Sequence, residues 1–182
     1  ISIFIFMSIQ NNIFMEIGKT IVFKKDAHIF EQGDINPNIY FVKKGLLKAY
    51  YITSEGKEFV KSFLDTGELI GSLRSASKDS PCYFSVVCLE ETEVLSVPFN
   101  KLIEHSKKNL DTATLLMNNL IELSMKKEKR EYEFLCMSAQ ERYKLFISER
   151  PQILDRVSLN DVAKFLGITA IALSRIRKRI NI

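Results

Sequence analysis

Five of the seven glycines in this 182-residue chain lie between positions 33 and 71, and the first three gaps between them are 12, 11 and 11 residues. Turn-forming residues at such regular intervals divide a chain into short strands. The runs around them are rich in β-branched and aromatic residues, at 39–42, 46–52, 59–64, 83–88 and 94–97. This pattern predicts an antiparallel β-sandwich or barrel rather than alternating strand–helix units.

The second and third of these runs are joined by the Ser-Glu-Gly sequence at 54–56, which predicts a hairpin turn. Side chains alternate between the two faces of a strand. Leu47, Ala49 and Tyr51 are therefore expected on one face, with Lys48 on the other. The sheet is predicted to be half-buried.

A long helix is expected after the strands, because residues 101–135 contain no glycine or proline. Apolar side chains recur there at helical spacing, and the predicted dimer contacts are Ala113, Leu116, Met117, Leu120 and Leu123, with Ile121 widening the stripe. A helix of about 30 residues is about 45 Å long, more than a small β-domain covers. A second copy of the chain is the expected cover. The alternative is that the helix packs along its own sheet.

The last 45 residues contain two short helices joined by a glycine. The Ser-Ala-Gln-Glu sequence at 138–141 predicts a capping box at the start of a helix that ends near Glu149, before Pro151. Ser158 is expected to cap a further short helix that Gly167 ends, and Thr169 opens the last one. Two helices with a tight glycine turn form a helix-turn-helix.

The residues of this motif suit it to DNA. Ala163 is small enough for the helices to approach closely, and Gly167 can adopt the positive φ of a sharp turn. A basic, exposed second helix fits the major groove. The predicted DNA-binding residues are Thr169, Ala170, Ser174, Arg175, Arg177 and Lys178. An ordinary helical hairpin with a basic surface is the alternative.

The charge distribution also indicates that the C-terminal part of the chain binds DNA. Residues 1–100 carry a net charge of −2, residues 101–137 carry +1 and residues 138–182 carry +5, within a total of +4. A slightly acidic body with a compact basic tail is expected when only the tail meets a polyanion.

The cysteine and histidine content argues against a metal site or a disulfide framework. Cys82, Cys88 and Cys136 are scattered, and only His28 and His105 could join them as ligands. Unpaired cysteines fit a reducing cytoplasm. Without a ligand cluster the chain is not expected to be an enzyme, and no cofactor is predicted.

The first six residues, Ile-Ser-Ile-Phe-Ile-Phe, are apolar but too short to cross a membrane, and they lack the basic flank and cleavage site of a signal peptide. No membrane association is expected. Met7 is interpreted as the natural start of translation.

Five short motifs occur in the order seen in the cyclic-AMP receptor/FNR (Crp/Fnr) family of bacterial transcription regulators. They are Phe-Glu-Gln-Gly at 30–33, Ile-Tyr-Phe-Val-Lys-Lys-Gly at 39–45, Gly-Glu-Leu-Ile-Gly at 67–71, Leu-Gly-Ile-Thr at 166–169 and Leu-Ser-Arg-Ile-Arg at 173–177. The chain resembles this family over residues 15–182.

The resemblance implies an α+β protein of three units. Residues 1–100 would form a cupin-like β-roll sensor, 101–137 a long dimerisation helix and 138–182 a helix-turn-helix domain of the winged-helix type. Double-stranded DNA, a second copy of the chain and RNA polymerase are the implied partners. No β-hairpin wing is expected, because the chain stops at Ile182, two residues after the last helix.

The resemblance also implies a pocket for a small effector, formed by Glu68, Leu69, Gly71, Ser72, Cys82 and Tyr83. Members that bind cyclic AMP hold its phosphate with an Arg-Ser pair, and here those positions fall near Cys82 and Tyr83. A thiol and a phenol cannot replace a guanidinium fork. Met125 and Lys126 stand where such members have a Thr-Ser pair that reaches the base. A response to cyclic AMP is therefore not expected, and Arg74 is a weaker candidate for an anion.

Other subfamily features are missing too. FNR-type members hold an iron–sulfur cluster with N-terminal cysteines, whereas the first cysteine here is Cys82. Members that read guanine-rich half-sites have Arg-Glu-x-x-x-Arg on the recognition helix, where this chain has Ala170, Ile171 and Arg175. A different operator is expected. The alternative function is a ligand-binding or protein-interaction module of this fold that does not read DNA.

Overall fold

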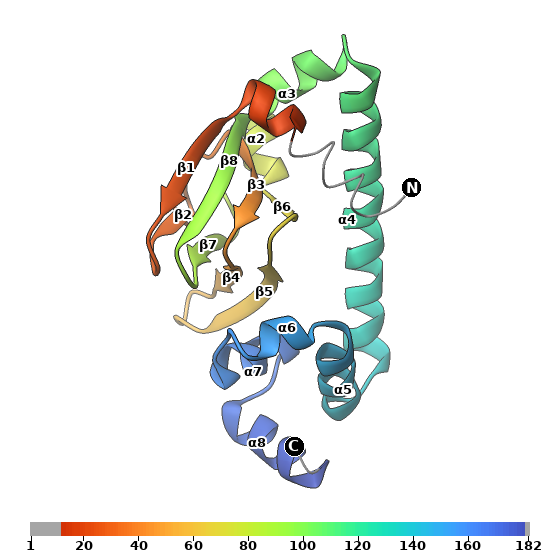
Figure 1. Cartoon of the computed structure of the whole chain (residues 1–182). Coiled ribbons are helices and arrows are strands. Elements are labelled where there is room, and N and C mark those ends of the chain that lie inside the picture. Colours follow the sequence, from red (N-terminus) through yellow and green to blue (C-terminus); the bar gives the residue numbers. More distant parts are fainter. Residues whose placement is uncertain (1–11, 181–182) are drawn as a thin grey trace.

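The computed structural model describes residues 12–180, which form a β-domain, a long helix beside it and a helical C-terminal unit beneath it (Figure 1). The predictions for the apolar start, for Met7 and for the end at Ile182 fall outside the described residues. Within residues 12–180, no helix is long and apolar enough to cross a membrane.

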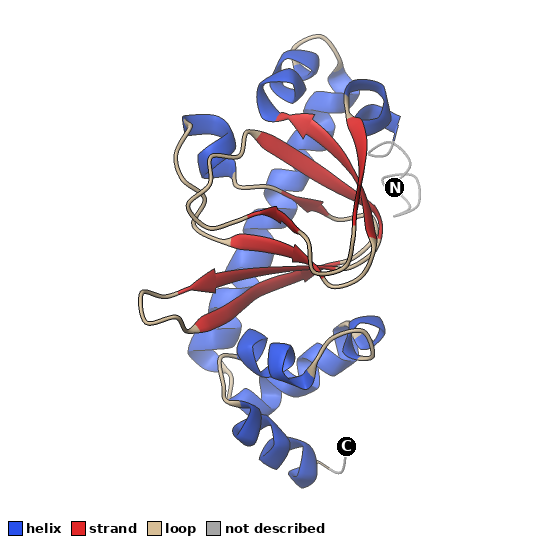
Figure 2. Ribbon diagram, turned by 90° about the vertical axis from the view of Figure 1, so that its left-hand side faces the viewer, coloured by secondary structure: helices blue, strands red, loops and turns tan. Residues whose placement is uncertain are grey.

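Two four-stranded antiparallel sheets face each other in the β-domain, as Figure 2 shows. One sheet has the order β1-β8-β3-β6 and the other β2-β7-β4-β5. The strands are β1 Lys19–Phe23, β2 His28–Phe30, β3 Asn38–Lys44, β4 Leu47–Ile52, β5 Glu58–Leu64, β6 Leu69–Ile70, β7 Ser85–Cys88 and β8 Thr92–Pro98. The antiparallel β-roll is confirmed. All five predicted runs overlap strands, while β1, β2 and β6 were not predicted.

The β-roll has its own core between the sheets, which includes Phe30, Val42, Leu47, Ala49 and Val86. Leu47 and Ala49 are fully buried as predicted. Tyr51, on the same face, lies at the rim and is 39% exposed. The hairpin turn is present, and Gly56 has a φ of +76° there, a value that favours glycine.

The prediction of one continuous helix from residue 101 is wrong. The structure has two helices, α3 Phe99–Ser106 and α4 Leu110–Cys136, after a short α2 at Leu73–Lys78. The break occurs because Asn109 is extended and its side chain accepts a hydrogen bond from the backbone N–H of Thr112, which starts a new helix. Only α4 provides the long element beside the β-roll (Figure 1).

Helix α4 buries only its first turns, at Thr112 and Leu115, in a cluster with α3 and the strands. Of the predicted dimer contacts, Ala113, Leu116 and Leu123 are partly buried, and Met117 and Leu120 are 57% and 53% exposed. An exposed row of apolar residues remains, here called the α4 stripe: Leu110, Met117, Leu120, Ile121 and Met125. The chain's own sheets do not cover this stripe.

The C-terminal unit contains α5 Ala139–Glu149, α6 Pro151–Leu154, α7 Leu159–Leu166 and α8 Ala170–Arg179. The predicted capping box is present, since Ser138 and Glu141 bond each other's backbone N–H groups. A second core joins this unit to the β-roll: Leu46, Val60 and Phe63 pack with apolar residues of α5, α6, α7 and α8. Helix α7 lies directly against β5.

Candidate nucleic-acid interface

Helices α7 and α8 form the predicted helix-turn-helix. Ser158 accepts a hydrogen bond from the N–H of Asp161, and Thr169 accepts one from the N–H of Ala172, so both helices have polar N-caps. Gly167 ends α7 with a φ of +71°. A Cβ at this position would lie 2.9 Å from the ring of Phe134, so both conformation and space favour glycine. These local features fix the angle at which α8 leaves α7.

Helix α8 turns one face inward and the other to solvent. Leu173 and Ile176 are buried in the core that α8 shares with α7. Thr169, Ala170, Ser174, Arg175 and Lys178 are all exposed, and Arg177 is partly buried. Ile171, also on the outer face, is 67% exposed. The structure therefore brings the predicted DNA-binding residues together on one accessible surface.

The charge of this surface is uncompensated. Arg175, Arg177, Lys178 and Arg179 belong to α8, and none of them forms an ion pair within residues 12–180. The Nε of Arg177 is buried without a hydrogen-bond acceptor. Cations with no partner in the protein are free to contact phosphates.

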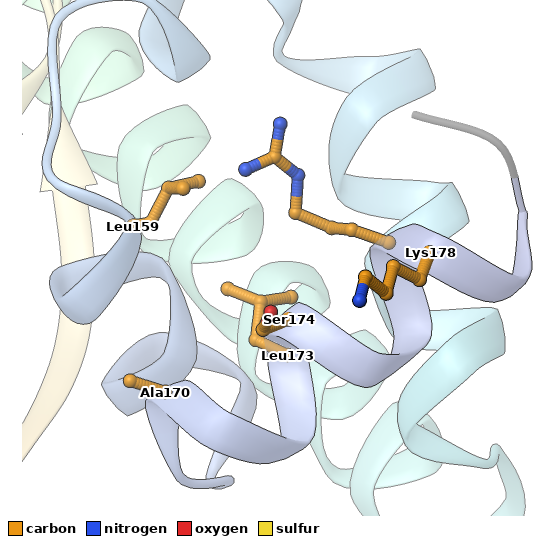
Figure 3. Close-up of a pocket in the computed structure, with 6 residues that line it drawn as sticks. Leu159, Ala170, Leu173, Ser174 and Lys178 are labelled. Atoms are coloured by element: carbon orange, nitrogen blue, oxygen red, sulfur yellow. The ribbon is translucent and has the colours of Figure 1, made fainter.

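A shallow hollow of about 280 Å³ lies between the start of α7 and the outer face of α8 (Figure 3). Its lining includes Leu159, Ala170, Ser174, Arg177 and Lys178. Both apolar and cationic side chains line it. This combination suits a surface that meets both base edges and a sugar–phosphate backbone.

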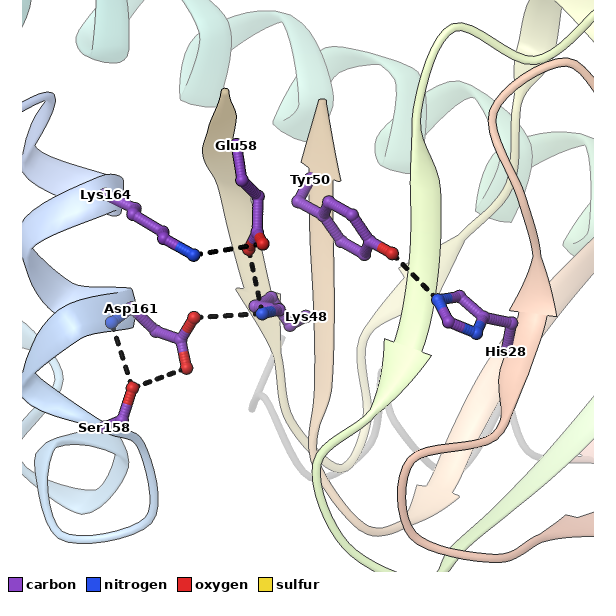
Figure 4. A network of polar contacts seen from close by, with 7 residues as sticks. All are labelled: His28, Lys48, Tyr50, Glu58, Ser158, Asp161 and Lys164. Carbon is purple, nitrogen blue, oxygen red and sulfur yellow. Dashed lines mark hydrogen bonds and ion pairs between the residues drawn. The ribbon is translucent and has the colours of Figure 1, made fainter. Parts of the chain in front are cut away.

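Helix α7 is held on the β-roll by a network of charges shown in Figure 4. The Lys48 ammonium lies 2.9 Å from a carboxylate oxygen of Glu58 and 2.9 Å from one of Asp161. Lys164 reaches the other oxygen of Glu58 at 3.0 Å. Asp161 also accepts a hydrogen bond from the hydroxyl of Ser158. Side chains of β4 and β5 are thereby tied to both ends of the first helix of the motif.

Burial and these bonds shift the pKa values of Lys48 and Glu58 in opposite directions. Burial lowers the pKa of Lys48, but its bonds to Asp161 and Glu58 outweigh this and the pKa lies above its usual value. Burial raises the pKa of Glu58, but the ammonium groups of Lys48 and Lys164 outweigh this and the pKa lies below its usual value. Both groups are therefore held in their charged forms.

The substitution Lys48→Met should weaken the attachment of α7, because it leaves Asp161 without its cation. We expect a loss of about 1–3 kcal/mol in the free energy of unfolding, measured by urea denaturation at neutral pH. The matched control is Lys44→Met, which removes an exposed lysine of β3. Equal losses for the two variants would contradict the assignment.

The same network predicts a pH dependence. Glu58 has a lowered pKa in the folded state, so its contribution is present above the unfolded pKa of about 4.3 and lost as pH falls through the folded value. Lys48 has a raised pKa, so its contribution is lost only as pH rises above about 10.4. The stability difference between wild type and Lys48→Met should shrink as acid is added below about pH 4.5.

A guanidinium from α4 forms a second link to α7. Arg130 donates a hydrogen bond of 2.7 Å to the carbonyl of Phe165 and one of 3.4 Å to the carbonyl of Val60 in β5. Its guanidinium carbon lies 3.9 Å from the centroid of the Phe165 ring. Burial is the main reason that the pKa of Arg130 falls to about 10. Arg130 thus contacts the β-roll and the helix-turn-helix at once.

The predicted effector residues lie in different surroundings in the β-domain. Cys82 is buried in the β-roll core, and Ser72 is buried as the N-cap of α2. Gly71 packs so tightly that a Cβ would lie 2.5 Å from Ile39. Leu69 packs against the cluster that includes Ile39.

The other two predicted effector residues face outward, but they already have partners. Glu68 forms a 2.9 Å ion pair with Lys126 of α4. Tyr83 is 60% exposed and carries the guanidinium of Arg74 at 4.5 Å from its ring centroid. Arg74 is exposed at the surface, against the ring of the residue that follows Cys82.

Sequence reasoning missed Lys48, Glu58, Asp161 and Arg130 as contacts of the helix-turn-helix. Lys48 and Asp161 are 113 residues apart, and Arg130 and Phe165 are 35 apart. Each residue alone has the pattern of a solvated surface charge. Only the tertiary structure shows that they meet.

Comparison with known proteins agrees with this geometry. The cyclic nucleotide-binding domain family matches residues 20–109. The transcriptional activator protein anr of Pseudomonas aeruginosa is 28% identical over 169 residues, which cover 86% of this chain and 68% of that protein. The fumarate and nitrate reduction regulatory protein of Shigella dysenteriae is 27% identical over 172 residues, covering 86% and 66%. The chain thus spans about two thirds of the length of these relatives.

Solved structures show the same fold. FixK2 from Bradyrhizobium japonicum superposes with a TM-score of 0.77 at 18% identity. The match covers 91% of this chain and 85% of the FixK2 chain. A CooA mutant from Carboxydothermus hydrogenoformans gives 0.76 at 15% identity, covering 93% and 78%. The order of β-roll, long helix and helix-turn-helix, the five motifs and these comparisons agree: in sequence and in fold the chain is similar to the transcription regulators of the Crp/Fnr family.

Proposed function

We propose that this protein is a homodimeric transcription regulator that binds a specific DNA sequence through α8 and responds to an effector other than cyclic AMP. The observation that carries the DNA-binding part is the outer face of α8. It is exposed and carries Arg175 and Lys178, neither of which has an ion-pair partner in residues 12–180. A helix of this kind fits the major groove.

Dimer formation is proposed from the α4 stripe. Its five apolar residues are each at least half exposed in the single chain. A parallel second copy would bury them, and it would also place two α8 helices on one duplex. RNA polymerase is a further proposed partner, since a regulator acts on transcription through it. A cytoplasmic location belongs to the same proposal, because Cys82, Cys88 and Cys136 are all unpaired.

The proposal that cyclic AMP is not the effector is supported by the surroundings of Cys82. This residue is 1% exposed and belongs to the β-roll core, so it offers no charge to a phosphate. The guanidinium of Arg74 lies at the surface, 4.5 Å from the centroid of the neighbouring Tyr83 ring. A cyclic phosphate needs a cation or several donors to replace its lost hydration.

A second function is favoured by one observation. Ile171 is 67% exposed at the second position of α8, where it adds an apolar side chain to the face proposed to bind DNA. It can contact a thymine methyl group, or it can belong to a surface that binds protein. The alternative is therefore a ligand-binding or protein-interaction module that does not read DNA.

The test is a mobility-shift titration of the purified protein with DNA from upstream of its own gene and with random DNA of equal length. Arg175→Ala should cost about 1–3 kcal/mol on the preferred fragment and relax base preference, whereas Lys178→Ala should weaken all sequences about equally. If no fragment binds better than random DNA at moderate salt, the module is the better description.

A further inference from the structure

Helix α8 is divided along its length into an apolar first turn and a cationic second half. The first turn, residues 170–173, consists of alanine, isoleucine, alanine and leucine and contains no acidic residue. Ala170 and Ile171 are its exposed members, and Ile171 is 67% exposed. The four cations of the helix all follow, from Arg175 onward. The outer face of α8 therefore begins with hydrocarbon side chains and continues with positive charges.

The neighbouring cations indicate which kind of partner covers the exposed isoleucine. Residues three, four and seven positions apart share one face of a helix, so Ile171 lies on the same side as Ser174, Arg175 and Lys178. Neither Arg175 nor Lys178 forms an ion pair within residues 12–180. An apolar protein surface would bury Ile171 but leave these charges without partners, whereas a duplex supplies phosphates on both sides of its groove. Charge complementarity thus favours DNA as the partner.

The chemistry of the first turn limits which base it can meet. The N-terminal residues of a recognition helix contact base edges in the major groove. All four bases present hydrogen-bonding groups there, and thymine alone adds a 5-methyl group. The side chains of Ala170 and Ile171 neither donate nor accept hydrogen bonds. A polar edge against them would lose water without a replacement, whereas a methyl group gains free energy by leaving water.

A third apolar side chain enlarges this surface. Leu159, the first residue of α7, is 42% exposed, and it lines the hollow of about 280 Å³ together with Ala170 (Figure 3). Ser174 and Lys178 line the same hollow, where their hydroxyl and ammonium groups can hold a phosphate. The apolar surface therefore joins the N-terminal ends of both helices of the motif and has phosphate-binding groups beside it.

We propose that Ile171, together with Ala170, is the specificity-determining part of α8 and selects thymine through its 5-methyl group. Each half-site then carries a thymine opposite the first turn of α8, and removal of that methyl group alone weakens binding. This selection rests on the proposed DNA-binding function and deepens it, because it assigns a base to the first turn. It also assigns Ile171 to DNA rather than to a protein partner.

The test uses the full chain and a duplex site selected from random sequences by repeated rounds of binding at moderate salt. Each thymine of the selected half-site is replaced in turn by deoxyuridine, which keeps the base pair and lacks only the methyl group. At one thymine, the dissociation constant should rise about fourfold when one half-site is changed and about fifteenfold when both are, because one methyl group per half-site is no longer buried. Fluorescence anisotropy of labelled duplexes provides the measurement.

The failure of methyl recognition and the failure of DNA binding give different results. If every deoxyuridine duplex binds as tightly as its parent, or if the selected half-site contains no thymine, methyl recognition is overturned and specific DNA binding stands. If the selection yields no site that binds better than random DNA, the proposed function is overturned and methyl recognition falls with it.

Substitutions at position 171 test whether this residue makes the contact. Ile171→Ala should reduce the preference for thymine over deoxyuridine to less than about twofold, and alanine at this exposed position preserves the helix. Ile171→Glu should change the preferred base pair there from T·A to C·G, because a carboxylate accepts a hydrogen bond from the cytosine amino group. The matched control is Lys178→Ala, which should weaken binding to both duplexes and keep their ratio. A thymine preference that survives Ile171→Ala contradicts the assignment.

The salt dependence separates the methyl contact from the phosphate contacts. Affinity for both duplexes should fall steeply as salt is added, because each phosphate contact releases counterions. The ratio between the thymine and deoxyuridine duplexes should stay constant within about twofold, because burial of a methyl group involves no charge. A ratio that declines in parallel with the affinity would show that the methyl group acts through the phosphate contacts, and would overturn direct recognition by Ile171.

Discussion

Phe63→Ala is expected to release the helix-turn-helix from the β-roll and to cost about 3–5 kcal/mol in the free energy of unfolding. Phe63 is 1% exposed on β5, and its ring centroid lies 6.2 Å from that of Phe146 and 5.6 Å from that of Phe165. These two rings belong to α5 and α7. Removing the ring therefore opens a cavity in the core that the two units share.

The measurement is urea unfolding combined with amide hydrogen exchange. In Phe63→Ala, protection in α7 and α8 should fall well below that of the β-strands. The matched control is Phe30→Ala, which removes a buried ring from the β-roll's own core. It should lower protection in the strands at least as much as in α8. The same exchange pattern in both variants would show that the shared core does not couple the units.

Leu120→Glu is expected to convert a dimer into monomers. Leu120 lies in the middle of the α4 stripe and is 53% exposed in the single chain. In a symmetric pair the substitution buries two unpaired carboxylates, and each costs several kcal/mol. The dissociation constant should rise ~100-fold or more, since every 1.4 kcal/mol is a factor of ten. Sedimentation equilibrium over a range of protein concentrations provides the measurement.

The control for this variant is Glu122→Ala, which also changes an exposed charge on α4 but lies outside the stripe. It should leave the dissociation constant within about twofold, as surface substitutions usually do. Circular dichroism verifies that both variants keep their helices. A dimer that survives Leu120→Glu would place the interface elsewhere on the molecule.

Much of the fold could be predicted because the relevant signals are local. Gly56 and Gly167 mark a turn and a helix end through positive φ, which disfavours other residues. Ser138 and Glu141 mark a helix start through bonds within four residues. The outer face of α8 follows from helical periodicity once Leu173 and Ile176 are placed inward.

The features that the sequence did not predict depend on a single capping bond or on pairing between distant parts of the chain. The break before α4 was missed because apolar periodicity continues across Asn109. The side chain of Asn109 accepts a hydrogen bond from the N–H of Thr112, and this bond starts a new helix. The strands β1, β2 and β6 were missed because their pairing partners, β8, β7 and β3, lie elsewhere in the sequence. A short run such as Leu69–Ile70 carries no periodic signal of its own.

The amino-acid sequence alone determined the order of units, the helix-turn-helix and the basic outer face of α8, because turns, caps and periodicity act over a few neighbouring residues. The tertiary structure decided which charges meet. It placed Lys48 against Asp161 and tied Arg130 to Phe165. These facts depend on where the chain returns after tens of residues, and on burial, which converts an ordinary surface charge into a strong interaction.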